Sequence, residues 1–274
     1  MKILLVNNRL LESTLRMGEK IADIFRLAGI EVLIDSCAAD ITREEIDFII
    51  VLGGDGTMIR AARQYARNEV PVLGVNMGTV GFLSNIKADE LEHCLERLMS
   101  RDYSLEERMM LEVSICRGET LMHKIDSLNE LSIKSKSARV LSLDVRIDGR
   151  EHGLYRGDGI IVATPSGSTA YSLSCGGPIT DPALEAFIVT PITSYLLNKR
   201  PLVVAADKEI DLCPLHCDEA LISVDGQVKI DWEDNYRVKV KKAEYKLLLV
   251  NMRPRHFFQT ISKRLRRSGD EMEQ

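Results

Sequence analysis

The amino-acid sequence predicts an α/β amino-terminal domain with a parallel sheet, followed by an all-β carboxyl-terminal sandwich. Three observations support this fold class. The chain has 274 residues, which suits two domains of ordinary size. Over the first hundred residues, short apolar runs alternate with segments whose apolar residues recur at the helical period. From about residue 103 the apolar residues recur at every second position, which is typical of strands with one buried face.

Residues 1–102 are assigned to the α/β domain because strands and helices alternate along them. Strands are predicted over 2–6, 31–34, 48–52 and 70–75, and helices over 14–28, 57–67 and 89–99. The run 48–52 contains no polar residue, so we expect it to be buried on both faces of its sheet. Alternation of this kind predicts a parallel sheet that is covered by helices.

Residues 103–252 are assigned to the sandwich. Apolar and polar residues alternate over 111–115, 141–147 and 236–240. The dipeptides Asp148-Gly149 and Asp225-Gly226 are typical of tight hairpin turns. Short strands joined by such turns predict two antiparallel sheets that pack face to face. A helical period returns from about residue 256 to residue 267.

The composition indicates a soluble cytoplasmic protein. The 36 basic and 41 acidic side chains give a net charge of −5, which argues weakly against a nucleic-acid partner. No apolar run approaches the roughly 20 residues of a membrane-spanning helix, and the amino terminus MKILLVNN lacks a signal-peptide cleavage site. The six cysteines are scattered, and the cluster Cys213, His216 and Cys217 lacks the further ligand of a zinc site. We therefore expect free thiols and neither nucleic acid nor membrane as a partner.

A glycine-rich loop, Gly-Gly-Asp-Gly-Thr at 53–57, follows the buried strand 48–52 and opens a helix. Glycines let the backbone approach a ligand closely, and a helix amino terminus presents free N–H groups to anions, so this loop suits phosphate. Asp55 would repel a polyphosphate and therefore needs a role of its own. It could accept a proton from an attacking hydroxyl, hold Mg²⁺, or simply cap the helix.

Two further loops carry small and polar residues. The segment 74–82 follows the next strand, so in a parallel sheet it lies at the same carboxyl edge as the loop at 53–57. The segment 158–179 is rich in hydroxyl groups and glycines and contains one aromatic ring, Tyr171, that could stack on a base. Such chemistry suits the ribose, amide and adenine edges of a nucleotide.

Together these motifs resemble the NAD kinase family. The resemblance rests on GGDGT at 53–57, Asn129-Glu130, and TPSGSTAYSLSCGGPI at 164–179, in the order and strand context of the family. It implies that 103–252 is a dinucleotide-binding domain and that a final helix, 253–274, returns to the first domain. It also implies a homodimer or a homotetramer.

The resemblance implies a role for each matching residue. Asp55 would be the catalytic residue that accepts the proton of the 2′-hydroxyl of the adenosine ribose of NAD, which attacks the γ-phosphorus of ATP and gives NADP. The residues implied at the ATP phosphates are Gly53, Gly54, Gly56 and Thr57. The residues implied at NAD are Phe82, Asn129, Glu130, Arg156, Asp158, Ser166, Thr169, Ala170, Tyr171 and Ser174. Mg²⁺ or another divalent metal is expected to accompany ATP, because two polyanions must come together.

Two other functions remain open at this point. A diacylglycerol-type lipid kinase shares the GGDGT loop, and a non-catalytic dinucleotide sensor would share the pocket. The sequence also leaves open NAD against NADH as acceptor, and ATP against inorganic polyphosphate as donor.

Overall fold

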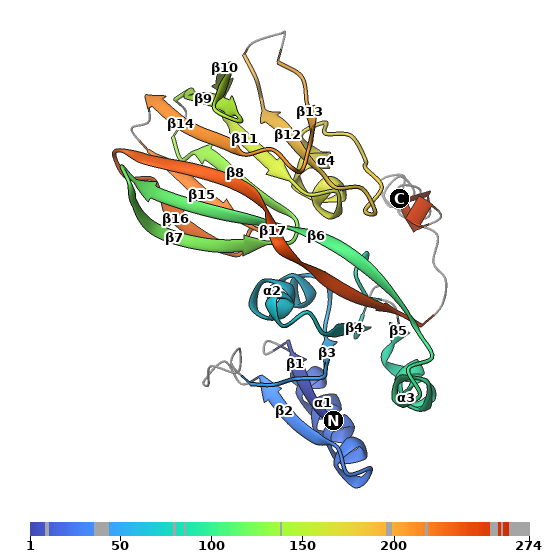
Figure 1. Ribbon diagram of the computed structural model, residues 1–274. Coiled ribbons are helices and arrows are strands. Elements are labelled where there is room, and N and C mark those ends of the chain that lie inside the picture. The colour runs from blue at the N-terminus through green and yellow to red at the C-terminus, as the bar shows by residue number, and fades with distance from the viewer. Residues whose placement is uncertain are drawn as a thin grey trace. The chain divides into compact units, whose positions relative to one another are not determined.

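The computed structural model describes residues 1–8, 11–35, 44–78, 81–84, 86–137, 139–195, 199–216, 219–252, 257–258 and 260–262. The chain divides into two compact units (Figure 1). Unit 1 consists of Met1–Glu107 and Leu247–Gln274, and unit 2 consists of Arg108–Lys246.

Unit 1 contains a parallel sheet, as the sequence predicts. Its strands are β1 (Lys2–Asn7), β2 (Glu31–Asp35), β3 (Phe48–Leu52), β4 (Pro71–Asn76) and the short β5 (Ile86–Lys87). The order is β2-β1-β3-β4, and β4 also pairs in parallel with β5 and with the end of β17 (Tyr236–Asn251). Every residue of β3 is buried, which confirms that this strand is covered on both faces.

Three α-helices accompany the sheet of unit 1, within about two residues of the predicted ranges. They are α1 (Glu12–Leu27), α2 (Asp55–Tyr65) and α3 (Leu91–Met99), with the short 3-10 turns η2 (Ala66–Asn68) and η3 (Ala88–Glu90) beside the last two. Phe25 of α1 and Leu98 of α3 lie in one apolar cluster with Ile50 of β3. The hydrophobic faces of α1 and α3 therefore cover the same face of the sheet.

Unit 2 is built from antiparallel strands and two short helical turns. The elements are β6 (Ser104–Arg117), β7 (Thr120–Ser127), β8 (Glu130–Ser135), β9 (Leu141–Ile147), β10 (Arg150–Gly157), β11 (Gly159–Ala163), η4 (Ser166–Thr169), α4 (Tyr171–Ser174), β12 (Ala186–Ile192), β13 (Leu202–Ala205), β14 (Ile210–His216), β15 (Ala220–Val224) and β16 (Val228–Asp231). One sheet has the order β13-β12-β11-β8-β15-β16, and all its neighbours are antiparallel. The other contains β10-β9-β14-β17, with β6 pairing with β17 and with β7.

The core of unit 2 lies between these two sheets (Figure 1). The alternating residues that the sequence singles out supply one side of it: Leu111, Val113, Ile115, Leu141, Leu143, Val145, Tyr236, Val238 and Val240. Residues of the facing sheet, among them Ile133, Val162 and Phe187, complete the cluster. The fold class predicted from the sequence is therefore confirmed as an α/β sheet with parallel strands plus an antiparallel sandwich.

Two hairpin turns form at the predicted Asp-Gly dipeptides. Asp148 and Gly149 have φ angles of 50° and 71°, and Asp225 and Gly226 have φ angles of 52° and 66°. Both residues of each pair thus occupy the left-handed region, which Asp tolerates and glycine favours.

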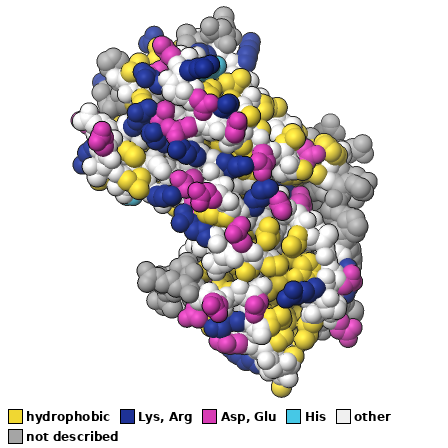
Figure 2. All heavy atoms as spheres, in the orientation of Figure 1, with side chains coloured by type: hydrophobic (Ala, Val, Ile, Leu, Met, Phe, Trp, Pro, Cys, Tyr) yellow, Lys and Arg dark blue, Asp and Glu magenta, His cyan; other side chains and the backbone are white. Residues whose placement is uncertain are grey.

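The surface of unit 2 mixes the two signs of charge. Figure 2 shows Lys and Arg side chains interleaved with Asp and Glu side chains on the face in view. Ion pairs across neighbouring strands include Lys124 with Glu112 at 2.9 Å and Lys239 with Glu209 at 2.8 Å. In the described part of the chain, no helix is long and apolar enough to span a membrane. The cysteines described there, 94, 116, 175 and 213, are free thiols.

Some sequence predictions are not tested by the fold. The final helix expected over 253–274 lies, apart from residues 257–258 and 260–262, outside the described residues. The cytoplasmic location and the domain boundaries at 102 and 252 stay predictions.

Strand β14 offers a matched test of the core of unit 2. Leu212 is fully buried between Val145 of β9 and Val238 of β17, whereas Leu215 on the same strand is 55% exposed. We expect Leu212→Ala to lower the free energy of unfolding by about 2–5 kcal/mol, because it leaves a cavity. Leu215→Ala should change it by less than about 0.5 kcal/mol. Urea denaturation of both variants measures the difference, and equal losses would contradict this description of the core.

Candidate active site

The loop at 53–57 joins β3 to α2 at the carboxyl edge of the parallel sheet. The N–H of Gly53 donates to the carbonyl of Val75 at 3.0 Å, which holds the loop against the end of β4. Gly54 is the N-cap residue of α2, and Asp55 is the first residue of the helix. The alternative in which Asp55 caps the helix is therefore wrong, because a glycine occupies the capping position and no side chain caps it.

The Asp55 carboxylate is held by the second glycine-rich loop. Its oxygens accept hydrogen bonds from the backbone N–H groups of Phe82 at 2.9 Å and Leu83 at 3.2 Å. A Cβ atom on Gly81 would lie only 1.8 Å from one carboxylate oxygen, so only glycine fits there in this arrangement. The loops after β3 and β4, which the sequence places at one edge, thus contact each other through Asp55.

Buried polar groups shape the second loop. The Asn76 side chain donates to the Ser84 hydroxyl at 3.2 Å and accepts from the N–H of Gly78 at 2.7 Å. Both side chains are almost inaccessible to solvent. Asn76 therefore contributes to the shape of the loop that carries Phe82 and Leu83.

The glycines of the first loop have different surroundings. A Cβ atom on Gly53 would lie 2.4 Å from the Thr57 hydroxyl, whereas one on Gly54 would meet nothing within 4 Å. Gly56 is exposed, and Thr57 is buried with its N–H donated to the carbonyl of Gly54 at 3.0 Å. Space for a ligand is therefore found beside Gly54, while Thr57 packs against Gly53.

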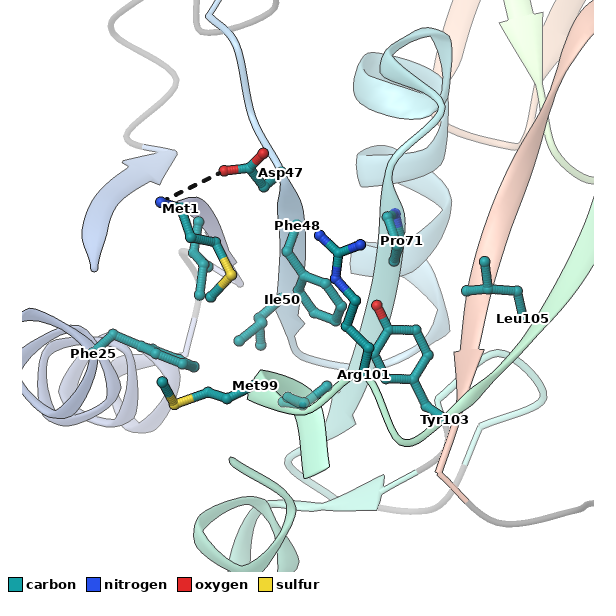
Figure 3. Close-up of a pocket in the computed structure, with 12 residues that line it drawn as sticks. Met1, Phe25, Asp47, Phe48, Ile50, Pro71, Met99, Arg101, Tyr103 and Leu105 are labelled. Atoms are coloured by element: carbon teal, nitrogen blue, oxygen red, sulfur yellow. Dashed lines mark ion pairs between the residues drawn. The ribbon is translucent and has the colours of Figure 1, made fainter. Parts of the chain in front are cut away.

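A cavity of 330 Å³ in unit 1 lies elsewhere (Figure 3). It is lined by apolar residues such as Phe25 and Phe48 and, at one side, by Arg101 and Asp47. Asp47 and Phe48 stand at the start of β3, whereas Asp55 follows its end. This cavity is therefore at the opposite edge of the sheet from the GGDGT loop.

In unit 2 the structure brings Asn129-Glu130 together with the segment from Thr164 onward. The carbonyl of Leu128 accepts the Thr164 hydroxyl at 2.5 Å, and the carbonyl of Asn129 accepts the Thr164 N–H at 2.8 Å. A Cβ atom on Gly167 would lie 2.1 Å from the Asn129 carbonyl oxygen. Two motifs that are 35 positions apart in sequence therefore form one backbone-to-backbone contact.

Glu130 is a buried acid of this cluster. Its side chain is 7% exposed, and burial together with the charge of Asp225 raises its pKa to about 8. The backbone N–H of Tyr171 donates to the carboxylate and opposes this rise. Oxygen Oε2 is buried without a hydrogen-bond partner among the described residues, so the carboxyl group has capacity for a further donor.

Tyr171 begins α4 and lies half-buried against Ile161, Ala163 and Ile188. The Lys134 ammonium is 5.9 Å from its ring centroid. Burial raises the pKa of the Tyr171 phenol, and charges at Cys175, Asp158 and Glu130 add to the rise.

The remaining candidates of unit 2 fall into two groups. Ser166 accepts a hydrogen bond from Arg108 at 3.2 Å, and Thr169 donates to the Ser166 carbonyl at 3.3 Å. Ala170 is half-buried and Ser174 is exposed, and both flank Tyr171 in the same segment. Arg156 and Asp158 are exposed at the other end of β11, where Gly159 pairs with Lys134 rather than with Glu130. Phe82 is half-buried and belongs to unit 1.

Sequence reasoning missed two residues that shape these clusters. Gly81 must lack a side chain because the Asp55 carboxylate occupies that space, and Arg108 donates to Ser166. Asp225, which the sequence places in a hairpin turn, also accepts hydrogen bonds from the Asn129-Glu130 segment.

The comparisons with known proteins agree with this arrangement. Residues 4–103 match the ATP-NAD kinase N-terminal domain, and residues 128–252 match the ATP-NAD kinase C-terminal domain. The chain is 38% identical to an NAD kinase of Natranaerobius thermophilus, covering 83% of this chain and 80% of that one. It is also 38% identical to an NAD kinase of Geotalea daltonii, covering 84% of each.

Two crystal structures show the same fold. An NAD kinase from Archaeoglobus fulgidus in complex with ATP superimposes with a TM-score of 0.78 at 28% identity, covering 97% of this chain and 99% of that one. A yeast NADH kinase complexed with NADH superimposes with a TM-score of 0.81 at 23% identity, covering 92% and 84%.

These matches define the chain as a phosphotransferase. It belongs to the ATP-NAD kinase family, and its activity is the ATP-dependent phosphorylation of NAD. The lipid-kinase and sensor alternatives are thereby set aside.

The contact between Gly81 and Asp55 predicts a sharp difference between two glycines of the second loop. Gly81→Ala would displace the Asp55 carboxylate, so we expect kcat to fall about 100-fold, the scale for a group misplaced by about 1 Å. Gly78→Ala is the matched control, since a Cβ atom there meets nothing within 4 Å. Steady-state assays of NADP formation test the pair, and a Gly81→Ala enzyme with the kcat of the control would refute the contact.

Proposed function

We propose that the chain transfers the γ-phosphoryl group of ATP to the 2′-hydroxyl of the adenosine ribose of NAD, with Asp55 as the general base. A bond forms between the ribose oxygen and the γ-phosphorus, the bond from the γ-phosphorus to the β–γ bridging oxygen breaks, and ADP leaves. The hydroxyl proton passes to Asp55. The observation that carries this proposal is a half-exposed carboxylate, fixed by two backbone N–H groups, inside a glycine-rich loop at a helix amino terminus.

The phosphates of ATP are proposed to lie along Gly53, Gly54 and Gly56. The amino terminus of α2 carries the positive end of the helix dipole, which attracts anions. The empty volume around Gly54 supports close approach of a phosphate. Thr57 is proposed at the same phosphates, at the first turn of α2, where its buried side chain packs against Gly53.

A divalent metal is proposed to enter with ATP. Among the described residues no group of three or more His, Cys, Asp or Glu could hold a metal ion. This fits Mg²⁺, which keeps several waters and is usually bound by substrate phosphates and one or two carboxylates. The metal would be held by the phosphates of ATP and would neutralise part of their charge.

The dinucleotide is proposed to bind the cluster of unit 2. Asn129, Glu130 and Tyr171 lie in it together with Ser166, Thr169, Ala170 and Ser174. Oε2 of Glu130, which is buried without a hydrogen-bond partner among the described residues, is proposed to bind a ribose hydroxyl. Asp158 is proposed at the nicotinamide amide, Arg156 at a phosphate or a neighbouring subunit, and Phe82 at the pocket lining. We also propose a homodimer or homotetramer.

The named relatives support the choice of substrates. The two relatives at 38% identity are NAD kinases, and the Archaeoglobus fulgidus enzyme was crystallised with ATP. We propose ATP as the donor and NAD as the acceptor.

Incubation with NAD, ATP and Mg²⁺ should yield NADP, detected with an NADP-specific dehydrogenase. Excess chelator should abolish the product, and added Mg²⁺ should restore it, because the metal neutralises the two polyanions. Undiminished turnover in chelator would remove the metal from the proposal. Phosphate found at a position other than the adenosine 2′-hydroxyl would overturn the regiochemistry.

The variant Asp55→Asn separates catalysis from folding. The amide cannot take the hydroxyl proton, so kcat should fall about 10²–10⁴-fold. One oxygen can still accept a backbone N–H, so the loss of stability should stay within about 1–3 kcal/mol. Asp89→Asn, in the exposed turn before α3, is the control and should keep kcat. A wild-type kcat for Asp55→Asn would exclude it as the base.

A further inference from the structure

The Asp225 side chain lies where strand β8 begins. Its carboxylate accepts hydrogen bonds from the Ser127 hydroxyl at 2.7 Å and from three consecutive backbone N–H groups. These belong to Leu128 at 3.1 Å, Asn129 at 2.8 Å and Glu130 at 3.2 Å. The N–H of Asp225 in turn donates to the carbonyl of Glu130 at 2.9 Å. A single side chain thus supplies the acceptors for the backbone just before the strand.

The Asp225 carboxylate lies where the pairing of strands β8 and β15 ends. The last paired residues of β8 and β15 are Leu131 and Val224, and Asp225 follows directly in the hairpin turn. Beyond that point the N–H groups of residues 128–130 need another acceptor, because a buried unpaired N–H costs free energy. Asp225 is 8% exposed, so the acceptor is a buried carboxylate rather than solvent.

The same backbone is held from its other side. The carbonyls of Leu128 and Asn129 accept from Thr164, as described above. The N–H groups of residues 128–130 therefore donate to the Asp225 carboxylate, and the carbonyls of Leu128 and Asn129 accept from Thr164. Hydrogen bonds thus hold this backbone segment from two sides.

The charge of Asp225 also affects the Glu130 side chain, which is proposed to bind NAD. The negative charge of Asp225 adds to burial in raising the pKa of Glu130, so Glu130 is largely protonated at neutral pH. Burial also raises the pKa of Asp225, and the four donated hydrogen bonds oppose that rise. A protonated Glu130 can donate as well as accept a hydrogen bond.

We propose that Asp225 is a positioning residue of the dinucleotide site, which sets the affinity for NAD by fixing the backbone that carries Asn129 and Glu130. This inference rests on the proposed NAD-binding role of those two residues. Asp225 itself does not act on the phosphoryl group, and its effect passes through residues 128–130. The hairpin geometry does not explain the arrangement, because φ angles in the turn do not require four hydrogen bonds to the side chain.

The other Asp-Gly hairpin provides a matched control. Asp148 has nearly the same φ as Asp225 and its carboxylate also accepts a backbone N–H, from Glu209 at 2.9 Å. It differs in lying at the surface, where Lys208 pairs with it at 3.1 Å. Asp148→Asn therefore changes the same residue type in the same kind of turn without touching residues 128–130.

The experiment measures KM for NAD, KM for ATP, kcat and melting temperature for Asp225→Asn and Asp148→Asn. Asp225→Asn should raise KM for NAD about tenfold, the scale of a lost hydrogen bond to a charged group. KM for ATP should stay within about twofold of wild type, and Asp148→Asn should change neither constant. A lower melting temperature with an unchanged KM for NAD would overturn the proposal and leave Asp225 a purely structural residue.

Two further variants keep the test decisive. If Asp225→Asn does not fold, Ser127→Ala, which removes one of the four hydrogen bonds, should still raise KM for NAD several-fold and leave KM for ATP unchanged. No rise in that variant would then overturn the proposal. Asn129→Ala tests the underlying site: if it leaves KM for NAD unchanged, the proposed dinucleotide site fails. If it raises KM and the Asp225 variant does not, only the positioning role fails.

Discussion

The hydrogen bonds from Phe82 and Leu83 to the Asp55 carboxylate are the constraint on which the site in unit 1 depends. They join the loop after β3 to the loop after β4, and they need a glycine at 81 to let the carboxylate in. A carboxylate beside a polyphosphate would otherwise be free to turn away from it. Two N–H donors fix its position while leaving lone pairs for a proton.

In unit 2 a carboxylate also accepts hydrogen bonds from backbone N–H groups, at the beginning of strand β8. Asp225 accepts three successive backbone N–H groups, as Asp55 accepts two. In both places a carboxylate from one loop replaces the missing backbone partner of another loop. The two side chains differ in exposure: Asp55 is partly exposed to solvent, as the proposed contact with substrate requires, whereas Asp225 is buried.

The sequence predicts the elements and motifs far better than the contacts between them. The spacing of apolar residues and the identity of turn residues are local properties. They are sufficient to predict the parallel sheet, the sandwich and the position of the GGDGT loop. The partners of Asp225 lie 95 to 98 positions away, and Gly81 meets a carboxylate 26 positions before it. No pattern within a window of a few residues carries that information. The burial of Thr57 is a further example, because it depends on how closely Gly53 approaches it.

Glu130 shows how the chain gives up stability for its site. Its pKa is about 8 in the folded protein and close to 4.5 in an unfolded one, so the folded state binds the extra proton between these values. Raising the pH through that window therefore lowers the free energy of unfolding, and the loss is complete above pH 8. A buried apolar residue at 130 would avoid this cost, but it would offer no polar atom to a ribose. The Oε2 atom without a hydrogen-bond partner among the described residues and the raised pKa both follow from the burial of Glu130, which suits the hydroxyl-binding role proposed for it.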